Sequence, residues 1–404
     1  MLHFSLVILV LLLAACGPSQ DDTTSRLPTA TARAVIDSRT PQPTLPPPPY
    51  REPSGPIDAS NAQGLAYLGR LDATGAPSSI FSYAFALDGS RLAALNNNSL
   101  LVWSLVDGRL SLNVPRNQAV RVYYASDLEE VYTVTERGEV VIRDPDTGRE
   151  VNRFFSDIQY NNVAAYDAER DLLALAGRSG LVQVWDAAER TARARLEAHR
   201  GPINALAFSN DGARLASAGV DGIVRIWDWS ARQQMAQFDL KDGGVGALAF
   251  SPDGQQVVVG TSQYIAVWNV ADSSLRYSLA VGFGGSADVL RYSPDGRSII
   301  TGGYEADMLL VSADDGQVIA QLPDVRGERV SATFSLDGSL LATSTLDGQA
   351  RLWNLSSLTA ETIASAPLDV AAQRLTDVTI SPDGFLLAFF DANGSVLLWG
   401  LPGG

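Results

Sequence analysis

The sequence predicts an all-β fold, namely an eight-bladed β-propeller made of four-stranded antiparallel blades. Asp-Gly pairs recur at intervals of 42, 42, 42 and 46 residues from Asp211 onward. Tryptophans recur with the same single or doubled period, at Trp103, Trp185, Trp227, Trp268, Trp353 and Trp399. Two independent marks that share one period indicate a repeat, and this period is that of a propeller blade. Ankyrin and tetratricopeptide units are shorter and need helical stripes that the sequence lacks.

Each repeat carries strand and turn signals in a fixed order. In the best-preserved unit, residues 203–228, small and apolar residues alternate up to the Asp211-Gly212 turn. A second strand is expected at 214–218 and, after the Asp221-Gly222 turn, a third at 223–227. Because Gly tolerates the positive φ of such turns and Asp can bond its own backbone, Asp-Gly between apolar runs predicts a hairpin.

Eight such units fit the chain. The doubled tryptophan intervals are filled by Ile142-Arg143-Asp144 and Leu310-Val311-Ser312, which occupy the tryptophan position. A fourth strand is expected after this position in seven units, at residues 110–114, 150–154, 192–197, 235–239, 275–281, 318–322 and 359–364. Only five residues follow Trp399, so the eighth fourth strand is expected from residues 64–72, paired with 396–399. This pairing closes the ring and removes exposed sheet edges.

The best-preserved unit also resembles a WD40 repeat, through Ala198-His199, Leu215-Ala216-Ser217, Asp221-Gly222 and Ile226-Trp227-Asp228. The resemblance extends from Gly64 to Trp399 and implies a propeller that binds other proteins. It also implies a structural hydrogen-bonded tetrad in this blade, formed by His199, Ser217, Asp221 and Trp227. The unit at 330–354 keeps Asp347 and Trp353, with Thr343 in place of the serine.

The first fifteen residues carry no charged side chain, and Leu6 to Ala15 is an apolar run. This run suits a signal peptide better than a membrane span, which needs roughly 20 apolar residues. Leu13-Ala14-Ala15-Cys16-Gly17 resembles the bacterial lipobox, which implies lipidation of Cys16 and a lipid-anchored protein outside the cytoplasm, at the cell surface or on the periplasmic side. The alternative is that Cys16 is a small residue that ends an apolar stretch.

Residues 16–62 are expected to form a disordered tether, and residues 63–404 the propeller. Eight prolines fall between Pro41 and Pro56, and the rest of the segment is polar or small. Such a composition cannot bury enough apolar area to offset ordering, and consecutive prolines favour a stiff polyproline II spacer. A ligand for proline-binding modules is the alternative function of this segment.

The charge and residue inventory excludes several classes of function. The chain has 45 acidic and 30 basic residues, a net charge of −15, which disfavours binding to nucleic acid. Beyond His3 in the signal peptide, His199 is the one histidine, and Cys16 is the one cysteine. No His-based triad, zinc cluster or Gly-rich nucleotide loop can be built. The sequence therefore predicts no catalytic residue, no metal and no cofactor.

Loops that depart from the repeat are the candidate binding site, because loops on a rigid scaffold diverge without cost to the core. Aromatic residues and arginines serve as anchors in protein interfaces. The candidates for partner contacts are Tyr160, Lys241, Tyr264, Phe283, Tyr304, Arg326 and Arg329. The predicted function is a non-catalytic platform for another extracytoplasmic protein. The alternative is a propeller enzyme, such as a glycan-active hydrolase or a quinoprotein-like oxidoreductase, that uses paired carboxylates on the ring face.

Overall fold

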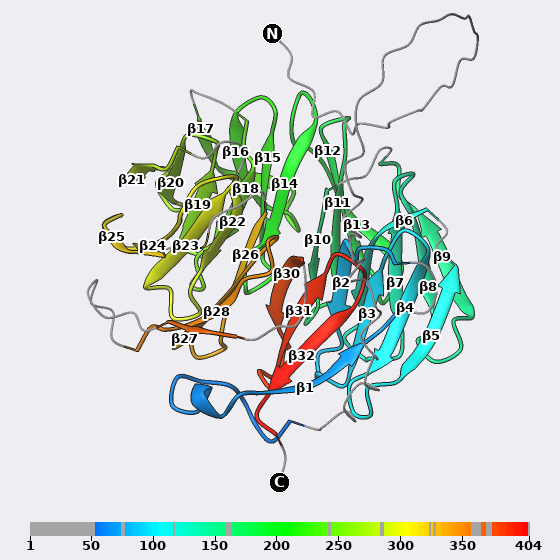
Figure 1. Cartoon of the computed structure of the whole chain (residues 1–404). Coiled ribbons are helices and arrows are strands. Elements are labelled where there is room, and N and C mark those ends of the chain that lie inside the picture. Colours follow the sequence, from blue (N-terminus) through cyan, green and yellow to red (C-terminus); the bar gives the residue numbers. More distant parts are fainter. Residues whose placement is uncertain are drawn as a thin grey trace, which may run out of the picture. The chain divides into compact units, whose positions relative to one another are not determined.

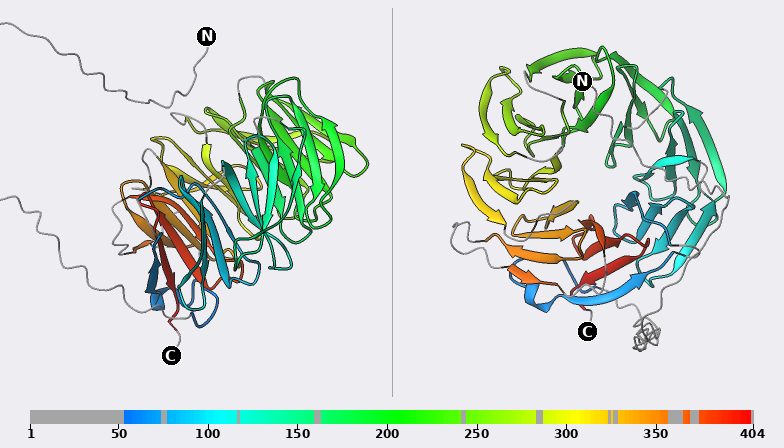
Figure 2. Two further views of the ribbon diagram at one scale, coloured as in Figure 1. Left: turned by 90° about the vertical axis from the view of Figure 1, so that its right-hand side faces the viewer. Right: turned by 45° about the horizontal axis from the view of Figure 1, so that its top comes forward.

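The computed structural model describes residues 53–402, except 74–76, 116–117, 159–162, 241–243, 283–286, 323–324, 326–328, 357–364 and 369–373. Within this part of the chain, eight four-stranded antiparallel sheets are arranged as the blades of a ring (Figure 2). The predicted all-β, eight-bladed propeller is therefore confirmed. The short 3-10 helix η1 (Ala62–Gly64) precedes the first strand.

The first four blades follow one another along the chain. Blade 1 contains β2 (Ser82–Phe85), β3 (Arg91–Leu95), β4 (Ser99–Ser104) and β5 (Leu110–Pro115), and blade 2 contains β6 (Ala119–Tyr124), β7 (Val131–Thr135), β8 (Glu139–Arg143) and β9 (Glu150–Phe155). Blade 3 contains β10 (Val163–Asp167), β11 (Leu172–Ala176), β12 (Leu181–Asp186) and β13 (Thr191–Glu197), and blade 4 contains β14 (Ile203–Phe208), β15 (Arg214–Gly219), β16 (Ile223–Asp228) and β17 (Gln233–Asp239).

The next four blades repeat this order. Blade 5 contains β18 (Ala247–Phe250), β19 (Gln256–Gly260), β20 (Tyr264–Asn269) and β21 (Leu275–Ala280), and blade 6 contains β22 (Ala287–Tyr292), β23 (Ser298–Gly303), β24 (Met308–Ser312) and β25 (Val318–Leu322). Blade 7 contains β26 (Val330–Phe334), β27 (Leu340–Thr345), β28 (Ala350–Asn354) and β29 (Ser365–Pro367), and blade 8 contains β30 (Leu375–Ile380), β31 (Leu386–Asp391), β32 (Val396–Gly400) and β1 (Ala66–Leu71). The fourth strand of blade 7 begins just after the expected range 359–364, all of which lies outside the described residues.

The N-terminal strand β1 closes the ring by pairing with β32 (Figure 1). The register aligns Ala66 with Gly400 and Leu71 with Val396. Leu68 and Leu71 are fully buried in the core that blade 8 shares with blade 1. The predicted closure by the N-terminal strand is confirmed.

A β-bulge marks the equivalence of β1 with the other fourth strands. In blade 1 the register of β4 and β5 shifts between Val102 and Trp103, and shifts at the matching position occur in blades 2 to 6. In blade 8 the shift lies between Tyr67 and Gly69, opposite Leu398 and Trp399. Because a bulge bends a strand and increases its twist, it lets the outer strand follow the twisted blade.

The turns between first and second strands owe their shape to the Asp-Gly pairs. In blade 4, Gly212 has a φ of 66°, a left-handed conformation that side chains other than glycine's rarely accept. Asp211 Oδ1 accepts hydrogen bonds from the backbone N–H of Ala213 at 3.0 Å and from the hydroxyl of Ser209 at 2.5 Å. These local bonds satisfy the turn without help from another blade.

The structured region begins before the predicted boundary at residue 63. Residues 53–62, which the sequence assigned to the disordered tether, pack against blades 7 and 8, and Ile57 is only 4% exposed. The backbone N–H of Ile57 donates to the carbonyl oxygen of Gly384 at 2.9 Å. The expectation was wrong for these ten residues because Ile57 packs between the neighbouring blades 7 and 8, whose residues are far from it in the sequence. Residues 1–52 lie outside the described residues, so the expected signal peptide, the lipidation of Cys16 and the rest of the tether stay predictions.

Candidate functional site

The strand order gives the ring two faces with different segments. The turns between second and third strands, together with the segments that lead from one blade to the next, lie at one end of the strands and form the upper face. The turns between first and second and between third and fourth strands form the lower face. Loops at the end of a rigid β-scaffold are the usual place for binding residues.

The candidate anchors that fall in the described residues all lie on the upper face. Tyr264 begins β20, is half-buried and packs on the core between blades 4 and 5. Tyr304 lies in the turn between β23 and β24 and is 39% exposed. Arg329 is exposed and directly precedes β26. The other candidates, Tyr160, Lys241, Phe283 and Arg326, lie outside the described residues.

Three exposed apolar residues on the upper face escaped the sequence reasoning. Phe81 precedes β2 and is 37% exposed, Phe155 ends β9 and is 63% exposed, and Val220 lies in the β15–β16 turn and is 53% exposed. They belong to blades 1, 2 and 4, so together with Tyr304 they are spread around the ring. Val220 alone had a local signal, because a valine directly before Asp221-Gly222 puts a large apolar side chain in a tight turn.

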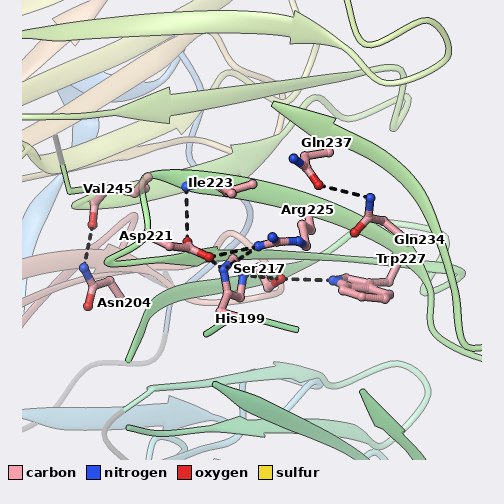
Figure 3. Close-up of polar contacts among 10 residues, drawn as sticks. All are labelled: His199, Asn204, Ser217, Asp221, Ile223, Arg225, Trp227, Gln234, Gln237 and Val245. Carbon is pink, nitrogen blue, oxygen red and sulfur yellow. Dashed lines mark hydrogen bonds and ion pairs between the residues drawn. The ribbon is translucent and has the colours of Figure 1, made fainter. Parts of the chain in front are cut away.

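The four residues of the expected tetrad lie in one chain of hydrogen bonds in blade 4 (Figure 3). Trp227 Nε1 donates to Ser217 Oγ at 3.0 Å. His199 Nε2 lies 2.9 Å from the same oxygen, and His199 Nδ1 lies 2.9 Å from Asp221 Oδ1. The side chain of His199 is fully buried and that of Ser217 has no exposed surface, so neither can exchange its protein partner for water.

This chain fixes the proton on the imidazole ring. Ser217 Oγ accepts from Trp227, so its own hydrogen points to His199 Nε2, and Nδ1–H then donates to the carboxylate of Asp221. Burial lowers the pKa of His199, which keeps the ring neutral, although the carboxylate of Asp221 opposes this effect. Burial alone raises the pKa of Asp221, but hydrogen bonds from His199, Arg225 and the N–H of Ile223 outweigh it and lower this pKa.

Arg225 completes the cluster from β16, where it lies opposite Ser217. Its Nη1 lies 3.2 Å from Asp221 Oδ2 and 2.9 Å from His199 Nδ1. Since Nδ1 carries the proton that is donated to Asp221, the productive contact of Arg225 is the ion pair with the carboxylate. Gly219 makes room for this cluster, because a Cβ there would lie 2.7 Å from His199 Nδ1. The cluster therefore holds Asp221, and with it the turn that presents Val220.

The other blades keep only parts of this arrangement. In blade 7, Trp353 Nε1 donates to Thr343 Oγ1 at 2.9 Å, and in blade 3, Trp185 Nε1 donates to Gln183 Oε1 at 3.2 Å. The indole nitrogens of three further tryptophans are buried without a hydrogen-bond partner, in Trp103, Trp268 and Trp399. The indole ring is thus used for packing in all of these blades, and for hydrogen bonding in only some of them.

Negative charge is concentrated on the lower face. Asp107, Asp144, Asp228, Asp272 and Asp315 lie in or directly beside the turns between third and fourth strands, and a hydrogen bond from a neighbouring hydroxyl or backbone N–H lowers the pKa of each of them. These carboxylates are therefore ionised at neutral pH. The described upper-face segments carry exposed side chains of both signs, with Arg137, Arg178, Arg200 and Arg329 beside Glu136, Asp157, Glu305 and Asp347.

The lower face also contains two hollows. One, of about 310 Å³, lies between blades 1 and 8 and is lined by Pro53, Asp88, Val106 and Asp383 among others. The second, of about 400 Å³, lies against blades 1 and 2 and is lined by Arg91, Glu130, Asp144 and Asp146 among others. Among the described residues, no group of three or more His, Cys, Asp or Glu side chains could hold a metal ion. None of the described helices is long and apolar enough to cross a membrane.

Comparisons with known proteins agree with this geometry. A family model for the WD domain, G-beta repeat, matches residues 190–228, 233–269 and 325–354. A bromodomain and WD repeat-containing protein of Dictyostelium discoideum is 33% identical over 116 residues, which is 28% of this chain and 5% of that protein. The chain therefore spans only a small part of this curated relative.

A similar ring exists among solved structures. The crystal structure of the computationally designed Ika8 protein superposes with a TM-score of 0.67 at 17% sequence identity, covering 81% of this chain and 98% of that one. This likeness concerns the fold alone. The three matched segments, which lie in and beside blades 4, 5 and 7, and the eight-bladed ring support membership of this chain in the family of WD40-repeat β-propellers.

Proposed function

We propose that this protein is a non-catalytic platform that binds another protein through its upper face. One observation carries the proposal: among the described residues, the large aromatic side chains that are exposed all lie on this face, with Phe81 37%, Tyr304 39% and Phe155 63% exposed, whereas the lower-face turns expose the aliphatic Val106 and Leu336. WD-repeat propellers are typically scaffolds for protein interactions. Apolar and aromatic side chains on a preorganised surface bind with little loss of conformational entropy.

The hydrogen-bonded cluster of His199, Asp221 and Arg225 holds the turn that carries Val220 in one conformation. Asp221 is held by His199, by Arg225 and by the backbone N–H of Ile223 at 3.2 Å. A side chain on a turn that is fixed in this way loses few conformations when a partner docks, so more of its burial contributes to affinity. Val220 is therefore the residue whose replacement most directly tests the proposed docking face.

The difference in charge between the two faces supports the same choice. The aspartates of the lower-face turns are well hydrated and ionised, and charged residues of this kind are depleted in the cores of protein interfaces. Arginines, which are enriched there, are exposed on both faces, at Arg178 and Arg200 on the upper and at Arg109 and Arg297 on the lower, so the distinction rests on the lower-face aspartates. A partner that needs a desolvated contact is thus favoured on the upper face.

The proposal includes lipid anchoring outside the cytoplasm through Cys16. It rests on the uncharged, apolar residues 1–15 and on the lipobox-like sequence Leu13-Ala14-Ala15-Cys16-Gly17. Two or more acyl chains are needed for stable anchoring, which a bacterial lipoprotein supplies. In this arrangement the partner is an extracytoplasmic protein.

The test is a crosslinking capture with the full chain and two matched variants. Val220→Asp places a charge on the upper face, whereas Val106→Asp makes the same change on the lower face at a valine of equal exposure, 55% against 53%. We expect Val220→Asp, and Tyr304→Asp in parallel, to lose the protein captured by the wild type, while Val106→Asp retains it. Equal capture by all variants, or loss with Val106→Asp alone, would refute the upper face as the docking site.

A further inference from the structure

The segment before β1, residues 53–61, is bonded to three separate parts of the ring. Pro53 forms an antiparallel bridge with Pro402, and the N–H of Ser54 donates to the carbonyl oxygen of Leu401 at 2.8 Å. The N–H of Ile57 donates to the carbonyl oxygen of Gly384, in the lower turn of blade 8, at 2.9 Å. The N–H of Ala59 donates to Ser339 Oγ, in the lower turn of blade 7, at 2.9 Å. The segment therefore joins the C-terminal residues, blade 8 and blade 7.

Ile57 anchors this segment in the seam between two blades. It is 4% exposed and belongs to the core cluster that contains Leu340 and Leu352 of blade 7 and Leu387 of blade 8. Ile57 is the one large apolar side chain between Pro53 and Asn61, so its burial is the main apolar contact of this segment. Figure 1 shows the segment and η1 running past the end of β32 beside β27 and β28.

A compact turn then directs the chain into β1. Asp58 Oδ1 accepts from the N–H of Ser60 at 2.7 Å and from its hydroxyl at 2.6 Å. Asn61 Oδ1 accepts from the N–H of Asp58 at 2.9 Å, and Asn61 Nδ2 donates to the carbonyl oxygen of Pro56 at 2.9 Å. These bonds fix the backbone conformation of the turn, so the position of Ile57 in space relative to the start of β1 is fixed as well.

We propose that residues 53–61 form a clasp that secures the closing seam of the ring. The strand β1 alone joins the N-terminal end of the propeller to β32, and strands at the end of a chain fray unless they are held. With the clasp in place, a force or a fluctuation on residues before 53 must break the contacts of Ser54, Ile57 and Ala59 before it can separate β1 from β32. The clasp stabilises the pairing of β1 with β32. Its role in keeping motion of the tether from opening the ring rests on the tether of the proposed function, but the stabilisation of β1 does not.

The test is hydrogen exchange measured by mass spectrometry on the full chain. In the wild type, peptides that cover residues 53–61 should be protected, because Ser54, Ile57 and Ala59 donate to the ring. In Ile57→Asp these peptides should lose protection, and peptides that cover β1 should exchange at least about tenfold faster, which corresponds to the loss of one buried isoleucine. Ser339→Ala removes the acceptor of Ala59 without changing the clasp itself and should shift both peptides in the same direction by a smaller factor.

The matched control is Val318→Asp, which places the same charge on an apolar residue of blade 6 that is already 44% exposed. It should leave the exchange of residues 53–61 and of β1 unchanged. The clasp is refuted if residues 53–61 exchange as fast as an unfolded peptide in the wild type. It is also refuted if Ile57→Asp and Ser339→Ala free these residues while β1 keeps its wild-type exchange. Repeating the measurement with Cys16→Ser separates the two proposals, because the effect on β1 must persist even if Cys16 carries no lipid.

Discussion

Substitution of His199 by alanine removes the centre of the hydrogen-bond chain in blade 4. In the wild type the proton of Ser217 has an acceptor in His199 Nε2, and Asp221 has a donor in His199 Nδ1, each at 2.9 Å. After the substitution, the hydroxyl of Ser217 loses its acceptor in a site without solvent access. Asp221 keeps its ion pair with Arg225, so one carboxylate partner survives.

The expected loss follows from these partners. Leaving a buried polar group without a partner costs about 1–3 kcal/mol, and the retained Arg225 pair argues against a larger loss through Asp221. We therefore expect His199→Ala to lower the free energy of unfolding of blade 4 by about 1–3 kcal/mol at pH 7.5. Partner capture should fall only slightly, through greater mobility of the turn that carries Val220, because the ring persists and His199 itself has no exposed side-chain surface.

The same geometry predicts a dependence on pH. Burial lowers the pKa of His199 below its ordinary value of 6.5, so the folded state binds fewer protons than the unfolded state in the window below 6.5. The stability contributed by the neutral ring is fully present above pH 6.5. It is lost as the pH falls from 6.5 toward the lowered pKa of the folded state. His199→Ala should lack this part of the pH dependence.

The assay compares wild type and His199→Ala by urea unfolding and by hydrogen exchange of blade 4 peptides at pH 7.5 and at pH 5. The exchange data are needed because a ring of eight blades need not unfold in two states. The difference between the two proteins should shrink from pH 7.5 to pH 5, since other titrating groups are common to both. Equal stability at pH 7.5, or a difference that does not change with pH, would show that His199 is not a buried, neutral hydrogen-bond partner.

Two further predictions concern a turn and the lipid anchor. Gly89 and Gly254 occupy the same turn position with φ of 72° and 67°, but a Cβ at Gly89 would lie 2.2 Å from Asp383 Oδ2, whereas at Gly254 the nearest atom is 3.7 Å away. Gly254→Ala should lower the free energy of unfolding by about 1–2 kcal/mol through backbone strain alone, and Gly89→Ala should lower it clearly more. Thermal unfolding measures both; equal losses would mean that the side chain of Asp383 moves aside at no energetic cost. Cys16→Ser should abolish acylation and move the protein out of the membrane fraction with the ring still folded, and mass spectrometry of the mature N-terminus checks this; an unmodified Cys16 in the wild type contradicts the anchor.

Much of the ring was predictable because its determinants are local and periodic. The Asp-Gly turns of six units place a left-handed glycine there, as at Gly212 and Gly254 with φ of 66° and 67°, whereas Leu128 and Asp171 take the left-handed conformation in blades 2 and 3. Closure by β1 followed from the strand pattern, since residues 64–72 have the pattern of a fourth strand and precede the first three-strand unit. These inferences required only the period and the chemistry of a turn.

The clasp and the exposed apolar residues could not be predicted in this way. Ile57 stands alone among prolines and polar residues, and the apolar side chains around it are Leu340, Leu352 and Leu387, which lie 283 to 330 residues later in the sequence. Phe155 continues the pattern of a strand, and only its place at the end of β9 on the outer edge of blade 2 makes it exposed. In both cases the environment of the side chain is set by segments that are distant in sequence.

The uneven survival of the tetrad indicates which part of the fold it serves. Trp103, Trp268 and Trp399 pack in their blades while their indole nitrogens have no partner, so a blade forms without the hydrogen-bond chain. Packing of the indole ring is therefore the common requirement, and burial of apolar area explains its recurrence. The full chain from Trp227 to Asp221 adds something that the fold of a blade does not need, namely a fixed position for the turn that carries Val220. If that turn is where a partner docks, His199→Ala should leave the ring intact but weaken capture slightly through a more mobile Val220, whereas Thr343→Val in blade 7 should affect stability only.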